Sequence, residues 1–74
     1  MTADHLINMA NSIGDFFVAM PDAQEARSDL ASHIHRSWEP RMRKAIYGHI
    51  DSTGGEGLRP IVLQALQEHR AKLT

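Results

Sequence analysis

The chain has 74 residues, a formal net charge of −1 and no cysteine. A chain this short forms one domain, residues 1–74, with a marginal core. The missing cysteines exclude disulfides, iron–sulfur ligation and thiolate metal sites, and they fit a cytoplasmic protein. A net charge near zero argues against generic nucleic-acid binding. Because no apolar run approaches ~20 residues, we expect no transmembrane helix and no membrane contact. We also expect no signal peptide, because the N-terminus lacks a basic segment and a continuous apolar core.

A first helix is predicted over residues 3–20. One stripe at helical spacing is expected to face the core: Leu6, Met9, Ala10, Ile13, Phe16, Phe17 and Met20. A second strip, Ile7, Gly14 and Val18, lies on another face. Since a surface helix of a monomer needs only one apolar face, the second strip predicts a contact outside the bundle.

A second helix is predicted over residues 22–37. Pro21 ends the first helix, and Asp22 is an N-cap whose carboxylate can accept the Glu25 N–H. The expected core positions are Ala26, Leu30, Ile34 and either His33 or Trp38.

A third helix is predicted over residues 40–51, because Pro40 suits the first helical position and holds Glu39 outside the helix. The segment 36–44 holds four basic residues and one acid, a local charge of +3. Together with Trp38, this composition is typical of a protein–protein hot spot. The alternative is that Trp38 fills the core while the arginines are solvated.

Residues 52–57 form a glycine-rich loop, and a fourth helix is predicted over residues 58–72 with Pro60 in its first turn. The loop lacks the GxxxxGK[ST] pattern of a phosphate-binding loop. It is a flexible or tightly turned connector, or its backbone docks on a partner. Leu63 lies off the core stripe and either covers a gap or joins a partner surface. The fold class is therefore all-α, a small four-helix bundle.

The side chains offer little chemistry. The five histidines include no HExxH pair, and no serine lies on a nucleophile elbow. A bundle of this size also leaves little room for a substrate pocket. We expect no catalytic, metal-binding or cofactor-binding residue, and no enzyme activity of the chain by itself.

Two motifs carry a family resemblance. WEPRMR, residues 38–43, is followed by GGEGLRP, residues 54–60. At this spacing the pair resembles the delta subunit of cytoplasmic NAD-dependent formate dehydrogenases, and the likeness extends to residues 6–11 and 60–66. In that family the large subunit carries a molybdenum or tungsten bis-pyranopterin cofactor, and other subunits carry Fe–S clusters, FMN and the NAD site. The resemblance implies that the delta subunit binds none of them.

The resemblance implies a small accessory subunit that binds the large catalytic subunit of formate dehydrogenase and aids assembly, stability or cofactor maturation. The expected partner contacts are Trp38, Arg41 and Arg43 at the corner between the second and third helices, Gly54, Gly55 and Gly57 in the loop, and the apolar Ile7, Val18 and Leu63. We expect Arg41→Glu or Arg43→Glu to weaken association with the large subunit and to leave the fold intact.

Two other functions compete with this one. The second strip of the first helix could be the symmetric interface of a homodimer. The basic segment 36–44 could bind nucleic acid, although the overall charge argues against it.

Overall fold

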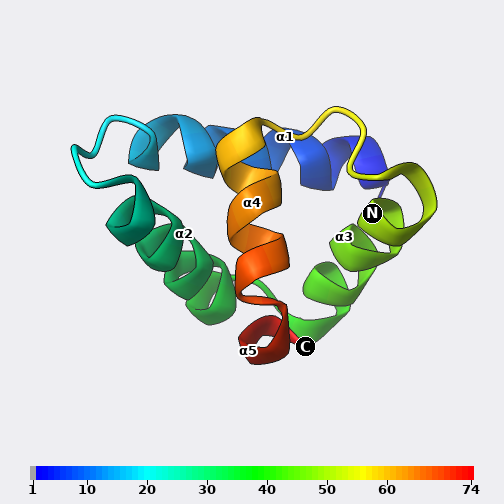
Figure 1. Cartoon of the computed structure of the whole chain (residues 1–74). Helices are drawn as coiled ribbons and strands as arrows, with labels where there is room; N and C mark the ends of the chain where they lie inside the picture. Colours follow the sequence, from blue (N-terminus) through cyan, green and yellow to red (C-terminus); the bar gives the residue numbers. More distant parts are fainter. Residues whose placement is uncertain (1) are drawn as a thin grey trace.

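A computed structural model describes residues 2–74 and contains only helices within them. They are α1 (Ala3–Phe17), α2 (Ala23–Ser37), α3 (Pro40–Thr53), α4 (Pro60–Glu68) and α5 (Arg70–Leu73). Figure 1 shows α1 lying across one end of the molecule, α2 and α3 converging away from it, and α4 running between them towards α5. The predicted all-α fold is confirmed.

The predicted cap of α2 is present. The Asp22 carboxylate accepts hydrogen bonds from the N–H groups of Gln24 and Glu25 at 2.9 and 3.1 Å. Pro40 and Pro60 each open a helix at its first position, where proline loses no helical hydrogen bond. Local sequence chemistry therefore sets the helix starts.

The helix ends differ from the prediction. α1 ends at Phe17 instead of residue 20, and α3 continues to Thr53 instead of residue 51. The predicted fourth helix is divided, because His69 leaves helical geometry with φ −109° and ψ 23°. The last turn, α5, can therefore fold back towards α2 and α3.

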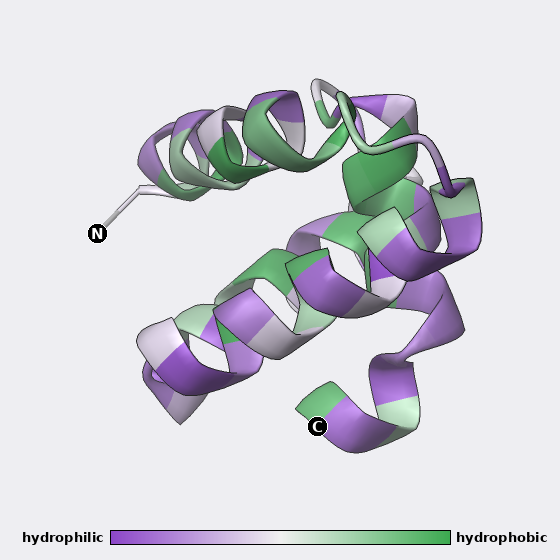
Figure 2. Cartoon of the chain, turned by 90° about the vertical axis from the view of Figure 1, so that its left-hand side faces the viewer, coloured by the Kyte–Doolittle hydropathy of each residue, from purple (hydrophilic) through white to green (hydrophobic). Residues whose placement is uncertain are grey.

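The core draws side chains from every helix. Its largest fully buried members are Leu6, Leu30, Ile34, Ile46, Leu66, Leu73 and Val62. Figure 2 shows hydrophobic and hydrophilic residues alternating around the helices, as expected when one side of each faces the core. Trp38, only 4% exposed, fills the core position that the sequence left open between it and His33.

The core prediction was wrong for Phe16, which is 75% exposed. The buried line of α1 runs through Leu6, Ala10 and Gly14. Phe16 lies roughly 160° around the helix from Gly14, at 3.6 residues per turn. Burial of Gly14 therefore turns Phe16 outward.

Gly14 is where α1 and α4 approach most closely. A Cβ atom at this position would lie 2.5 Å from Cγ2 of Val62 and 3.3 Å from Cγ2 of Ile61. On the same strip, Ile7 packs against Gly57 of the loop. The contact predicted for this strip is thus made largely by the chain's own α4 and loop. Only Val18 remains open to solvent, at 60% exposure.

Tyr47 carries the one buried hydroxyl that spans two helices in the described core. Its hydroxyl donates to the Leu66 carbonyl oxygen at 2.7 Å, and the residue is 3% exposed. Burial raises the pKa of Tyr47 from 10.0 to about 12, although the positive charges of Arg70 and Arg43 oppose the rise. The folded chain therefore keeps the phenol proton at a pH where the unfolded chain loses it.

This difference predicts an alkaline limit to stability. The contribution of Tyr47 is fully present below about pH 10 and is lost as the pH rises towards about 12. Urea unfolding at several pH values should show the free energy of unfolding falling across this window. Because Tyr47 is the only tyrosine, phenolate absorbance reports its titration directly. For Tyr47→Phe, the free energy of unfolding should fall less steeply with pH over this window. An equal slope for the variant and the wild type would contradict the assignment of this pH dependence to Tyr47.

No helix between residues 2 and 74 combines the length and the apolar character needed to cross a bilayer.

Candidate functional site: an aromatic patch on α1

Apolar side chains gather on the outer side of α1 near its end. Ile13, Phe16 and Phe17 line a shallow hollow of about 340 Å³ together with Ser12 and His33 of α2. We call these five residues the aromatic patch. Its apolar side chains come from a single turn of α1, and α2 supplies its edge.

The rings of the patch are held in defined positions. Phe16 and Phe17 pack edge to face with ring centroids 5.1 Å apart. Phe17 in turn lies 6.1 Å from the His33 ring. The exposed Phe16 ring therefore packs against the half-buried ring of Phe17. Such a ring can enter an apolar pocket of another protein with little loss of conformational freedom.

The corner between α2 and α3 is built differently from the sequence prediction. Trp38 is buried, and the part-buried Arg43 lies across the corner. Its Nη1 donates to the carbonyl oxygens of Trp38 at 2.8 Å and His35 at 3.1 Å, and its Nε donates to the Leu73 carbonyl oxygen at 3.0 Å. Arg43 thus ties α2, α3 and α5 together. These contacts favour a different expectation from the sequence: Arg43→Glu should also weaken the fold.

Arg41 points into solvent instead. Its side chain is 83% exposed, and its one ion pair among residues 2–74, with Glu39, measures 3.5 Å. The structure therefore brings Trp38 and Arg43 together within the fold and leaves Arg41 free to contact another molecule.

The glycine loop is tightly turned. Gly54, Gly55 and Gly57 all have positive φ, from 77° to 88°, a region that side-chain-bearing residues adopt at a cost. The Thr53 hydroxyl accepts the N–H groups of Gly55 and Glu56 at 3.2 and 3.0 Å. The loop is therefore the tightly turned form of the connector.

Asn11 of α1 holds this loop in place. Its Nδ2 donates to the Gly57 carbonyl oxygen at 2.9 Å, and its Oδ1 accepts the Arg59 N–H at 2.9 Å. Leu63 also packs over Gly55 of the loop. This role of Asn11 was not predicted, because an asparagine on a helix face carries no signal for a partner so distant in the chain.

Groups that could hold a metal ion are absent from the described part of the chain. No three histidine or carboxylate side chains between residues 2 and 74 lie close enough together for one. What the surface offers is contact area and charge.

Comparison with known families then decides the chain's membership. The model of the NADH-dependent formate dehydrogenase delta subunit, FdsD, matches residues 5–66. The chain belongs to this family. Neither the curated proteins nor the solved structures gave a match. FdsD membership implies that the chain associates with other subunits of a formate dehydrogenase complex.

Proposed function

We propose that the chain is a non-catalytic accessory subunit that binds the large catalytic subunit of a cytoplasmic formate dehydrogenase through the aromatic patch. Its binding energy would stabilise that subunit during assembly or during insertion of its molybdenum or tungsten cofactor. The Fe–S clusters, FMN and NAD site that the resemblance implies would lie in other subunits. FdsD membership supports the subunit role.

The exposure of Phe16 is the observation that carries the choice of surface. A phenylalanine gains about 1.5–3 kcal/mol when it is fully buried, and Phe16 gains little of this in the free chain because it is 75% exposed. The ring is supported by Phe17 and the hollow beside it is apolar. A protein partner that covers the patch recovers this free energy.

The contacts predicted from the sequence divide into two groups. Arg41 and Val18 are exposed and stay proposed contacts. The other seven have a role within the fold, Gly54 through the positive φ that ends α3 and the other six through contacts: Trp38, Arg43, Gly54, Gly55, Gly57, Ile7 and Leu63. For these seven, a contact with another protein stays a prediction.

The test of the aromatic patch is Phe16→Asp. Co-expressed with a tagged large subunit, this variant should be recovered at less than about one-tenth of the wild-type yield, because a charged side chain cannot enter an apolar pocket without a partner. Ala3→Asp is the control: Ala3 is also an exposed apolar residue of α1, but it lies at the opposite end of the helix from Phe16. Circular dichroism should show both variants folded. Equal recovery of Phe16→Asp and wild type would overturn the choice of surface.

The homodimer is the second candidate function, and the exposure of Val18 favours it. Light scattering on the isolated chain, together with the binding assay, distinguishes the homodimer from the accessory subunit. If the isolated chain is a dimer, and Val18→Asp makes it a monomer that still binds the large subunit, both interfaces exist. A dimer that binds no large subunit would favour the homodimer alone.

A further inference from the structure

The chain's basic residues fall into two groups by their partners. Four of the eight form ion pairs: Arg27 with Glu68, Arg41 with Glu39, Arg59 with Asp15 and Arg70 with Asp51. Hydrogen bonds from Arg59 and Arg70 hold the pKa of Asp15 and of Asp51 below the ordinary value. The other four, Arg36, Arg43, Lys44 and Lys72, have no carboxylate of residues 2–74 within 4.0 Å.

These four unpaired cations gather at one end of the molecule. Arg36 Nε donates to the Ser32 carbonyl oxygen at 3.3 Å, and Lys72 Nζ donates to the Ser32 hydroxyl at 3.4 Å. Arg43 joins the same region through the His35 and Leu73 carbonyl oxygens, and Lys44 is its neighbour on α3. We call Arg36, Arg43, Lys44 and Lys72 the basic end.

The acids that form no ion pair with a lysine or arginine of residues 2–74 lie elsewhere. They are Asp4, Asp22, Glu25, Asp29 and Glu56. These positions belong to the start of α1, the α1–α2 turn, the first half of α2 and the α3–α4 loop, all towards the α1 end of the molecule (Figure 1). The chain is therefore electrically polarised, although its net charge is only −1.

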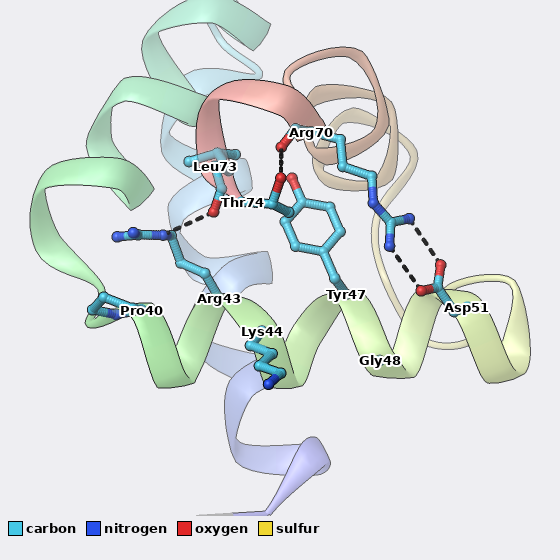
Figure 3. Close-up of a pocket in the computed structure, with 9 residues that line it drawn as sticks. All are labelled: Pro40, Arg43, Lys44, Tyr47, Gly48, Asp51, Arg70, Leu73 and Thr74. Atoms are coloured by element: carbon cyan, nitrogen blue, oxygen red, sulfur yellow. Dashed lines mark hydrogen bonds and ion pairs between the residues drawn. The ribbon is translucent and has the colours of Figure 1, made fainter.

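A groove of about 550 Å³ opens beside the basic end, between α3 and α5. Figure 3 shows the Tyr47 ring in it, between Arg43 and Arg70, with Gly48 next along α3. A Cβ atom on Gly48 would meet nothing within 4 Å, so neither packing nor a positive φ requires glycine there. Its missing side chain leaves the groove open. The lining includes the apolar residues Leu73 and Pro40 and the ion pair of Arg70 with Asp51.

We infer that the basic end and this groove bind an acidic segment of another subunit of the complex, with its carboxylates against Arg36, Lys44 and Lys72 and an apolar side chain over Gly48. The inference rests on the proposed function, since it assigns a second contact surface to the same subunit. Unpaired cations beside an apolar groove suit a segment that carries both carboxylates and an apolar residue. A nucleic acid fits less well, because the acidic α1 end would repel a long polyanion.

The first test uses the chain's own chemistry. A carbodiimide activates a carboxylate so that an amine joins it as an amide without a spacer. Lys44 and Lys72 are the chain's only lysines, so few amines of this chain can form such a link. Treatment of the purified complex and mass spectrometry of its peptides should show Lys44 or Lys72 joined to Asp or Glu of another subunit. Links only within the chain, or to a second copy of it, would overturn the inference.

The second test compares two variants of equal net charge. Lys44→Gln with Lys72→Gln removes two positive charges from the basic end, and Gln24→Glu with Gln64→Glu adds two negative charges at exposed positions elsewhere. We expect the lysine variant to weaken association with the complex about tenfold in low salt and to make the association less dependent on salt. The glutamine variant should change the affinity and its salt dependence little. Equal effects of the two variants would overturn the inference.

The outcomes also separate this inference from the proposed function. If the wild-type chain does not co-purify with the large subunit, the proposed function fails and the inference fails with it. If the chain co-purifies but neither lysine is linked to another subunit, only the inference fails. Salt-sensitive binding of the isolated chain to a labelled RNA or DNA, lost in Lys44→Gln with Lys72→Gln, would assign the basic end to nucleic acid instead.

Discussion

Replacement of Gly14 by Leu is expected to lower the free energy of unfolding by about 3 kcal/mol or more. Even a Cβ atom at Gly14 would lie 2.5 Å from Val62, a stiff β-branched residue that is fully buried. A leucine side chain must therefore force α1 away from α4. Since a domain of this size is only marginally stable, urea or thermal unfolding should show a large fraction unfolded under native conditions.

Gly48→Leu is the matched control for this experiment. Both glycines lie inside helices, but a side chain at position 48 would enter open space. Leucine also forms helices better than glycine by up to about 1 kcal/mol. The same substitution should therefore stabilise the chain slightly at Gly48 and destabilise it severely at Gly14. Similar melting temperatures for the two variants would contradict the close packing of α1 on α4.

Arg43→Met is expected to destabilise the chain by roughly 2–4 kcal/mol, through the loss of hydrogen bonds from a charged donor. The guanidinium group serves three carbonyl oxygens, those of His35, Trp38 and Leu73. Methionine keeps much of the side chain's length and none of its donors. Two of these carbonyl groups belong to the corner between α2 and α3, and the third belongs to α5. Urea unfolding of Arg43→Met and wild type should show this difference in the free energy of unfolding.

Arg41→Met tests whether the loss in Arg43→Met is specific. Arg41 lies two residues away on the same helix, is 83% exposed and has one long ion pair, so its replacement should change the free energy of unfolding by less than about 0.5 kcal/mol. An Arg43→Met chain as stable as Arg41→Met would mean that the three carbonyl groups find equivalent partners in water. Arg43 would then be available to a partner, as the sequence suggested.

The helices could be predicted from sequence because their starting signals are local. Asp22 caps α2 through N–H groups two and three residues away, and Pro40 and Pro60 set their helix starts through their own rings. The outward position of Phe16 could not be predicted in the same way. Periodicity fitted a stripe through Phe16 and Phe17, but close approach of α4 at Gly14 turned the buried face. That approach depends on residues more than forty positions along the chain.

The candidate site was predicted in part for a related reason. Tryptophan and arginine supply the same contacts whether they anchor a partner or close a corner within the fold. Trp38 and Arg43 do the latter, while Arg41 and Val18 remain at the surface. Gly14, only two residues before Phe16, was the available sign that the stripe was misplaced. Pairing of the basic residues depends on tertiary contacts, so the basic end becomes visible only in the structure.

The two hydrogen bonds of the Asn11 amide join α1 to residues 46 and 48 positions further along the chain. The conformation of the loop between α3 and α4 therefore depends partly on contacts with a helix from the other end of the sequence. Its opening and the detachment of α1 are therefore one cooperative event. A protein that binds the aromatic patch would hold α1 in place. Through Asn11 it would also stabilise the loop that contains the three glycines, although that loop lies on another side of the helix.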